Sequence, residues 1–277
     1  MQIWIQPREK GLEPRYADQP INLISSRRAE VRRKLCFSTY RFKQSAAKPH
    51  RSLRITFLRK IQIKQDKIEG FAYLSEAYLA TDPNFTGRIT VPVLWDKKEK
   101  RIVNNSEDDI CQMWAGVFKP LAKHPVDLFP EDLKAVQDEL SQQIYEDVNN
   151  GVYEAGFASS QAAYEDAFGK LFDRLDRLEA HLAENAPYLF GERIVETDYR
   201  LFCTLVRFDV VYFGHFKCNK NRIEDYPHLQ GYLERIYRLQ GLAETVDFDH
   251  IKRHYYYTHD EINPSRIVPV GPRLGWA

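Results

Sequence analysis

The sequence predicts a small α/β segment followed by an all-α helical bundle. Two observations lead to this fold class. Short apolar runs at residues 89–94 and 102–103 flank a charged turn, which is typical of paired strands. From residue 107 onward, hydrophobic side chains recur instead at helical spacing. The 277 residues, 43% of them hydrophobic, suffice to bury the core of one or two domains.

Charge divides the chain into two parts. Residues 1–65 contain 16 Lys and Arg against 4 Asp and Glu, a net charge of +12, whereas the remainder contains 24 against 35, a net charge of −11. Such asymmetry is typical of a nucleic-acid-binding arm, and the alternative is a poorly ordered appendage. Residues 1–50 lack sustained periodicity and residues 53–64 suggest only a weak strand. We therefore expect a poorly ordered basic segment over residues 1–65, with nucleic acid as an unfavoured partner.

The elements after this segment follow in order. Residues 70–83 predict a helix that ends at Pro83, and residues 107–117 predict another helix directly behind the two strands. The face of the first helix that we expect to be buried comprises Phe71, Leu74, Tyr78 and Leu79.

Five further helices are expected, at residues 131–149, 161–184, 199–213, 229–238 and 243–248, before an irregular tail. The third is apolar nearly all round, which predicts a place at the centre of a bundle. The expected buried stripes are Leu133, Val136, Leu140, Ile144 and Val148 in the first, and Tyr164, Phe168, Leu171, Phe172, Leu175, Leu178 and Leu182 in the second.

One helix start is predicted to be incompletely capped. Asp198 stands three residues after Val195, at the spacing of a capping box, but valine has no side-chain acceptor. The missing half is worth about 1 kcal/mol of helix stability.

The composition excludes several classes of protein. The chain has no run of about 18 apolar residues, so we expect no membrane-spanning helix. It begins without the apolar stretch of a signal peptide, which favours a cytoplasmic location. The four cysteines follow no disulfide-framework spacing, which favours reduced thiols; they are Cys36, Cys111, Cys203 and Cys218.

Five motifs closely resemble one family. They are TGRITVPVLWDKKEKRIVNN, YEDVNNGVYEAGFA, RLFCTLVRFDVVYFGHFKCNKNRIEDYPHLQGYL, VDFDHIKRHYYYTHDEINP and IVPVGP. In this order they resemble the glutathionyl-hydroquinone reductases, a xi-class, omega-like group of glutathione transferases, over about residues 68–273. The resemblance implies an incomplete or divergent thioredoxin-like domain at 66–118, a helical C-terminal domain at 119–258 and a tail at 259–277.

The resemblance also implies a glutathione site. Pro92 matches a family cis-proline that lets the backbone of Val91 pair with the cysteinyl unit. Glu107 and Asp108, at a helix N-terminus, would take the γ-glutamyl amine, although the family's usual Glu-Ser order is replaced here by Ser106-Glu107-Asp108. The alternatives are an ordinary edge-strand proline and an ordinary capping sequence.

Tyrosines are implied to bind the quinol-type substrate. Tyr153 and either Tyr255 or Tyr256 match family tyrosines that contact the ring and its oxygens, a task that suits a phenol. From the residues alone, all three read as core or interface aromatics. The histidine pairs with metal-compatible spacing, His250 with His254 and His215 with Cys218, also favour packing, so no metal is expected.

The family's nucleophile is the cysteine of Cys-Pro-Trp-Ala, a motif that does not occur in this sequence. Its thiolate attacks the glutathionyl sulfur and releases the hydroquinone, and a second glutathione resolves the mixed disulfide. Cys36, in CFSTYR, is the nearest substitute. The resemblance therefore implies a homodimeric glutathione-dependent reductase or transferase, and the absence of Cys-Pro-Trp-Ala predicts poor turnover or none by this chain. The alternatives are a non-catalytic transferase-like protein and the product of a frameshifted or decayed gene.

Overall fold

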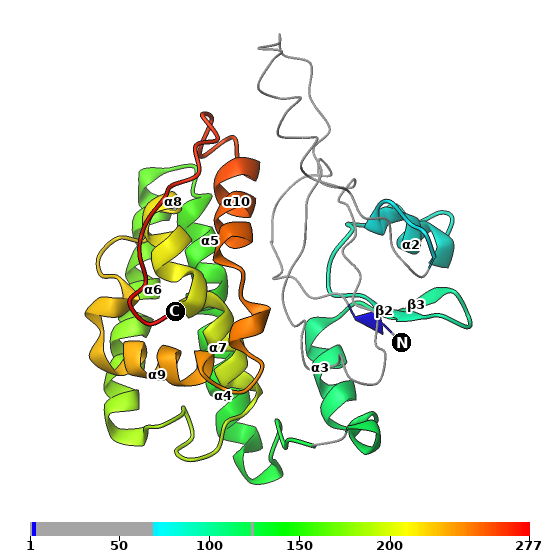
Figure 1. Cartoon of the computed structure of the whole chain (residues 1–277), viewed down its shortest axis with the longest axis horizontal. Helices are drawn as coiled ribbons and strands as arrows, with labels where there is room; N and C mark the ends of the chain where they lie inside the picture. The colour runs from blue at the N-terminus through cyan, green and yellow to red at the C-terminus, as the bar shows by residue number, and fades with distance from the viewer. Residues whose placement is uncertain (1, 4–68, 123–124) are drawn as a thin grey trace. The chain divides into compact units, whose positions relative to one another are not determined.

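The structure is a computed structural model that describes residues 2–3, 69–122 and 125–277 (Figure 1). Its contacts divide the chain into two compact units, Met1–Glu107 and Asp108–Ala277. The expected weak strand at residues 53–64 lies outside the described residues, and so does the expected poorly ordered segment over residues 1–65 except for Gln2–Ile3, which form a strand. The four-part domain division expected from the sequence stays a prediction.

The first unit contains a three-stranded sheet in the order β1 (Gln2–Ile3), β2 (Leu94–Asp96) and β3 (Arg101–Asn104). Both pairings are antiparallel. The β2–β3 turn forms because the Asp96 carboxylate accepts the backbone N–H groups of Lys98 (2.8 Å) and Glu99 (3.0 Å). These two bonds lower the pKa of Asp96. The strand expected at residues 102–103 is confirmed within β3.

The strand expected over residues 89–94 is wrong for all but its last residue, because β2 begins only at Leu94. The physical reason lies in the backbone groups. Both the N–H and the carbonyl of Thr90 bond to the hydroxyl of Tyr78, and Pro92 has no N–H to give to a neighbouring strand.

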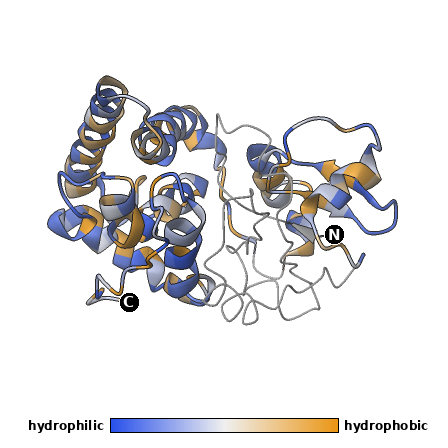
Figure 2. Ribbon diagram, turned by 90° about the horizontal axis from the view of Figure 1, so that it is seen from above, coloured by the Kyte–Doolittle hydropathy of each residue, from blue (hydrophilic) through white to orange (hydrophobic). Residues whose placement is uncertain are grey.

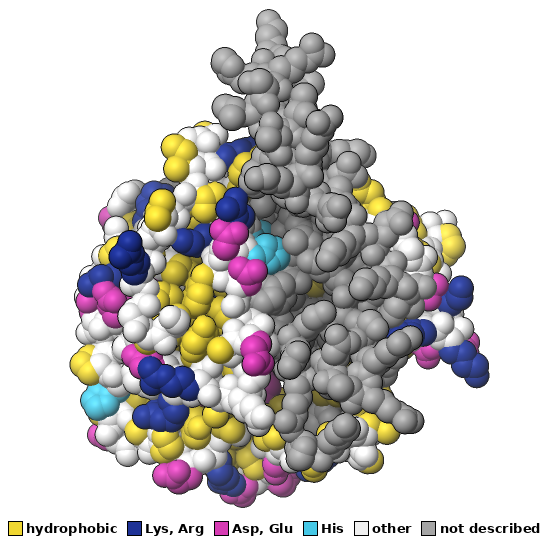
Figure 3. Space-filling view, in the orientation of Figure 1, with side chains coloured by type: hydrophobic (Ala, Val, Ile, Leu, Met, Phe, Trp, Pro, Cys, Tyr) yellow, Lys and Arg dark blue, Asp and Glu magenta, His cyan; other side chains and the backbone are white. Residues whose placement is uncertain are grey.

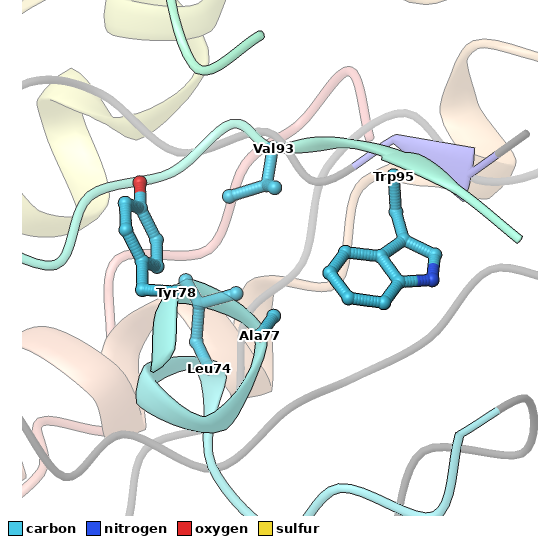
Figure 4. Close-up of a cluster of buried hydrophobic side chains, with 5 residues drawn as sticks. All are labelled: Leu74, Ala77, Tyr78, Val93 and Trp95. Carbon is cyan, nitrogen blue, oxygen red and sulfur yellow. The ribbon is translucent and has the colours of Figure 1, made fainter. Parts of the chain in front are cut away.

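Helix α2 (Leu74–Thr81) begins where the side chain of Glu76 accepts the N–H groups of Ala72 and Tyr73, each at 2.8 Å. This cap places the helix start four residues later than the sequence pattern suggested. Figure 4 shows three helix residues facing two strand-side residues, and together they form the core of the unit: Leu74, Ala77, Tyr78, Val93 and Trp95. The expectation that Leu79 is buried is wrong, since 46% of it is exposed and Ala77 takes that place on the buried face.

The second unit is built from helices (Figure 1). In chain order they are α3 (Glu107–Ala115, whose first residue belongs to the first unit), η2 (Lys119–Leu121), η3 (Glu131–Leu133), α4 (Lys134–Ile144), η4 (Tyr145–Asn150), α5 (Gly151–Gly156), α6 (Gln161–Asn185), α7 (Glu196–Arg207), η5 (Phe208–Tyr212), α8 (Phe213–His215), η6 (Ile223–Asp225), α9 (Pro227–Tyr237), η7 (Ala243–Thr245) and α10 (Phe248–Thr258). Helix α5 packs on α6, α6 on α9, and α10 on η5. In Figure 2 the same helices carry hydrophobic residues on some faces and hydrophilic residues on others.

The long helix α6 confirms its predicted stripe from Leu171 to Leu182, whereas Tyr164 and Phe168 are only half-buried. Ser160 caps its start by accepting the N–H of Ala163 (3.2 Å), and its buried side chains recur at helical spacing: Ala167, Leu171, Phe172, Leu175, Leu178 and Leu182. The apolar helix expected at residues 199–213 is also buried, as α7 followed by the π-helical turn η5. The bundle expected from the sequence is therefore confirmed.

Helix α4 differs from its expected stripe. Val136 was expected inside but is 52% exposed, whereas the neighbouring Gln137 is buried. Gln137 turns inward because its amide donates to the carbonyl of Leu128 (3.0 Å). The expected stripe holds farther along, at Ile144 and Val148.

A helix was missed near the C-terminus. The prediction of a helix at residues 243–248 followed by an irregular tail is wrong, because only a short turn, η7, forms there and α10 begins at Phe248. Asp247 caps α10 by accepting the N–H of His250 (2.9 Å). Only Ile251 and Tyr255 of this helix are buried, so its sequence carries little apolar periodicity.

The incomplete capping box at α7 is confirmed. Asp198 Oδ2 accepts the N–H of Val195 (2.8 Å), while the valine side chain offers no acceptor in return. The other carboxylate oxygen accepts from Leu189 N–H and from the Tyr232 hydroxyl, both at 3.0 Å. Burial raises the pKa of Asp198, and these three donors oppose the shift.

Two further properties concern the surface and the helix lengths. In Figure 3, acidic and basic side chains are interspersed over the visible face of the helical unit, with hydrophobic side chains gathered between them. No helix in the described ranges combines the length and the apolar character needed to cross a membrane.

Candidate functional site

The segment Thr90–Pro92 is held in place by hydrogen bonds from the Tyr78 side chain to Thr90. The Tyr78 hydroxyl donates to the carbonyl of Thr90 (2.7 Å) and accepts from its N–H (3.3 Å). Val91 is half-buried and Pro92 is buried, and the peptide bond between them is cis, as the resemblance implied. Val91 therefore directly follows Thr90, whose backbone N–H and carbonyl are both already hydrogen-bonded within the protein.

A second segment of the same unit leads into α3. The side-chain oxygen of Asn104 accepts the N–H of Ser106 (2.7 Å), and Asn105 Nδ2 donates to the Tyr78 hydroxyl (3.1 Å). Glu107, half-buried, is the first residue of α3. Helix N-terminal N–H groups favour a carboxylate ligand, and a glutamate side chain favours an amine.

Asp108 belongs to the second unit by its contacts and forms an ion pair there. Its carboxylate lies 2.7 Å from Arg200, which also contacts Glu196 at 2.8 Å. The Arg200 and Glu196 side chains are largely buried, whereas that of Asp108 is 59% exposed. This pair joins the first turn of α3 to α7.

Three tyrosine hydroxyls meet inside the helical unit, and we call them the tyrosine trio: Tyr153, Tyr212 and Tyr255. The hydroxyl oxygens are 2.5 Å apart for Tyr153 and Tyr255, 2.9 Å for Tyr212 and Tyr255, and 3.3 Å for Tyr153 and Tyr212. All three side chains are buried. The π-helical turn η4 ends three residues before Tyr153, and η5 ends at Tyr212; such turns are frequent at functional sites.

The Tyr212 phenol stays protonated at ordinary pH. Burial raises the pKa of Tyr212 well above its usual value, and the positive charge of Arg207, itself only 8% exposed, opposes that shift. A neutral phenol both donates and accepts one hydrogen bond readily, so the trio can meet hydroxyl or carbonyl oxygens of a planar ring. Phe216 stacks on Tyr212 with ring centroids 5.5 Å apart, which supports the trio from the apolar side.

Tyr256 lies apart from the trio. Its ring contacts the imidazole of His215 (centroids 4.6 Å apart), and its hydroxyl oxygen lies 3.0 Å from the position that a Cβ on Gly214 would take. Of the three tyrosines expected at the quinol site, the structure therefore brings together Tyr153 and Tyr255. Tyr212, which the sequence pattern presented only as part of an apolar helix, joins them.

Two buried histidines form a pair beside Tyr256. Nε2 of His215 lies 3.1 Å from Nδ1 of His259. Burial lowers the pKa of His215 to about 4 and that of His259 to about 3. Over the described part of the chain, no three His, Cys, Asp or Glu side chains gather closely enough to hold a metal ion.

The expected nucleophile, Cys36, lies outside the described residues. Of the other cysteines, Cys218 is buried, and burial raises its pKa to about 12, which leaves the thiol protonated. Cys111 is half-buried in α3 and Cys203 is exposed on α7.

Comparison with known proteins identifies the class of protein to which this chain is similar. Residues 161–235 match the family model of the glutathione S-transferase C-terminal domain. Glutathionyl-hydroquinone reductase PcpF of Sphingobium chlorophenolicum is 46% identical over 217 residues, which are 78% of this chain and 69% of that protein. Glutathionyl-hydroquinone reductase YqjG of Escherichia coli K12 is 50% identical over 200 residues, which are 72% of this chain and 61% of that protein.

Solved structures agree. The glutathione-bound structure of YqjG matches with a TM-score of 0.74 at 48% identity, covering 76% of this chain and 68% of that one. The xi glutathione transferase of Phanerochaete chrysosporium matches with a TM-score of 0.73 at 45% identity, covering 76% and 72%. The chain belongs to the glutathionyl-hydroquinone reductase family, the xi class of glutathione transferases. It spans about two thirds of the length of these relatives.

Proposed function

We propose that the chain binds glutathione and a quinol-type ligand as the reductases of its family do, and that it turns over glutathionyl-hydroquinones slowly as written. The observation that carries the binding proposal is the pairing of two fixed segments in the first unit. Thr90 in the first segment and Asn105 in the second both bond to the Tyr78 hydroxyl, and both residues belong to the motif that resembles the family.

Glutathione meets these segments through different groups. The backbone of Val91, beside Pro92, pairs with the cysteinyl unit. The carboxylate of Glu107 takes the γ-glutamyl amine, while the N–H groups at the start of α3 attract the carboxylate. Asp108 is the second candidate for the amine, because Arg200 already engages its carboxylate.

The quinol-type ligand meets Tyr153 and Tyr255, with Tyr212 behind them; Tyr256 is the weaker candidate. Three hydroxyls within 3.3 Å of one another already satisfy one another, so a ligand oxygen replaces one of these bonds rather than filling a vacancy. The aromatic ring of the ligand would pack on phenol and phenylalanine faces.

Slow turnover follows from the nucleophile. In the family's reaction a cysteine thiolate attacks the glutathionyl sulfur, the carbon–sulfur bond breaks, and the ring carbon takes a proton to give the hydroquinone. A second glutathione then reduces the mixed disulfide and leaves as glutathione disulfide. The Cys-Pro-Trp-Ala motif is absent from the sequence, and Cys218 has a raised pKa. A non-catalytic glutathione-binding protein is therefore the second candidate function.

The binding proposal is tested by calorimetric titration of the full chain with reduced glutathione. We expect Glu107→Gln to weaken binding roughly tenfold or more, because a charge-assisted hydrogen bond to the amine is lost. Glu139→Gln is the matched control, since Glu139 is exposed on α4, where its carboxylate accepts a hydrogen bond from the side-chain amide of Gln143 (3.4 Å). Absence of glutathione binding by the unaltered chain contradicts the proposal, and equal affinity in Glu107→Gln removes Glu107 from the site.

A further inference from the structure

The hydroxyl of Tyr78 is the meeting point of three segments of the first unit. Tyr78 belongs to α2 and is only 4% exposed. Its oxygen bonds to the N–H and the carbonyl of Thr90 and to Asn105 Nδ2, and it lies 3.1 Å from Thr90 Oγ1. Figure 4 shows this hydroxyl pointing away from α2, toward the chain that leads to Val93.

These bonds use the full capacity of a phenol. The O–H donates to the carbonyl of Thr90, and the two lone pairs accept from the backbone N–H of Thr90 and from the Asn105 amide. A second, longer bond from Asn105 to Thr90 Oγ1 (3.4 Å) closes the network.

Packing alone does not explain the hydroxyl. The ring of Tyr78 contacts Phe85 with centroids 4.8 Å apart and lies in the core with Val93, and a phenylalanine ring would fill the same space. Burying a hydroxyl is unfavourable unless it is fully bonded. The role of the hydroxyl therefore follows from its hydrogen-bond partners, Thr90 and Asn105, which lie in the two segments proposed to hold glutathione.

We infer that Tyr78 is a positioning residue for glutathione, which sets the spacing between Val91 and Glu107 without touching the ligand. Thr90 directly precedes Val91, and Asn105 stands two residues before Glu107. One oxygen on a helix thus fixes the segment for the cysteinyl backbone and the segment for the γ-glutamyl amine relative to each other. This inference rests on the proposed function for its ligand, but the positioning itself can be measured without one.

The experiment compares the full chain with Tyr78→Phe by two measurements. Hydrogen–deuterium exchange without ligand reports the positioning. We expect roughly tenfold faster exchange in peptides covering Thr90–Val91 and Asn105–Glu107. Calorimetric titration with reduced glutathione reports the consequence, and we expect roughly tenfold weaker binding with little change in the melting temperature.

Two further variants separate positioning from general loosening. Tyr145→Phe is the matched control, because the Tyr145 hydroxyl is buried in η4 and has no hydrogen-bond partner among the described residues. It should change neither measurement. Thr90→Val removes only the side-chain oxygen and keeps both backbone bonds, so we expect a smaller effect than that of Tyr78→Phe.

The outcomes are distinguishable. Unchanged exchange in both segments of Tyr78→Phe overturns the positioning role, whatever the affinity for glutathione. Faster exchange with unchanged glutathione affinity overturns the link to the ligand. If the unaltered chain binds no glutathione, the proposed function fails and the ligand part of the inference fails with it, while the exchange measurement still decides whether Tyr78 positions the two segments.

Discussion

One N–H lies between the imidazoles of His215 and His259, whose nitrogens are 3.1 Å apart. The ring that accepts this bond has to be neutral, because both nitrogens of a protonated imidazole are donors. Burial is the main cause of their lowered pKa values. Lys217 lowers the pKa of His215 further, while the charge of Asp260 raises that of His259 and opposes the effect of burial. These two residues therefore link stability to pH.

The sign of this dependence follows from the proton balance. The ordinary pKa of histidine is 6.5. Between this pH and about pH 4 the unfolded chain binds protons that the folded pair does not, so the free energy of unfolding decreases as the pH is lowered. We expect a loss of about 2 kcal/mol per histidine on going from pH 7.5 to pH 5. Urea unfolding at both values tests this.

His259→Asn serves as the comparison for that measurement, because asparagine keeps a donor and an acceptor but does not titrate. The variant should show a shallower decline in stability between pH 7.5 and pH 5. An identical slope for the variant and the unaltered chain would contradict the role of the pair.

At the scale of elements, the end of α5 lies so close to Phe216, the residue after α8, that there is no room for a side chain at Gly156. A Cβ on Gly156 would lie 2.2 Å from the ring of Phe216, which is fully buried and stacks on the tyrosine trio. Glycine is needed here for close approach rather than for an unusual backbone angle. The fit between these two elements therefore supports the position of the trio.

Gly156→Ala should destabilise the protein by about 1–3 kcal/mol, because the ring of Phe216 has to move. Gly169→Ala is the matched control in α6, where a Cβ meets no atom within 4 Å. It should stabilise by up to about 1 kcal/mol through helix propensity. Urea midpoints measure both changes. Similar midpoints for the two variants would contradict the claim that contact with Phe216 makes a side chain at Gly156 destabilising.

At the scale of the whole molecule, the sequence allowed the helical half to be predicted better than the strand half. The stripe of α6 and the buried α7 with η5 follow from apolar spacing alone. The start of α2, the late start of β2 and the start of α10 depend on hydrogen bonds from individual side chains, Glu76, Tyr78 and Asp247, which hydrophobic periodicity does not reveal.

The candidate site divides in the same way. Val91, Pro92, Glu107 and Tyr153 were found through family resemblance, because their types carry no distinctive chemistry in isolation. Tyr212 and Tyr78 were assigned to the core, since a buried tyrosine in an apolar helix looks the same in sequence whether or not its hydroxyl bonds to a distant segment. The homodimer and the cytoplasmic location stay predictions.

The central claim is that this member of the reductase family binds its ligands but lacks an efficiently placed nucleophile. Its most direct test is turnover of a glutathionyl-hydroquinone with reduced glutathione, measured on the full chain and on Cys36→Ser. A thiolate misplaced from the substrate sulfur forfeits several kcal/mol of barrier reduction, so we expect slow turnover that is similar in both proteins. Robust turnover that vanishes in Cys36→Ser would contradict the account and identify Cys36 as the nucleophile.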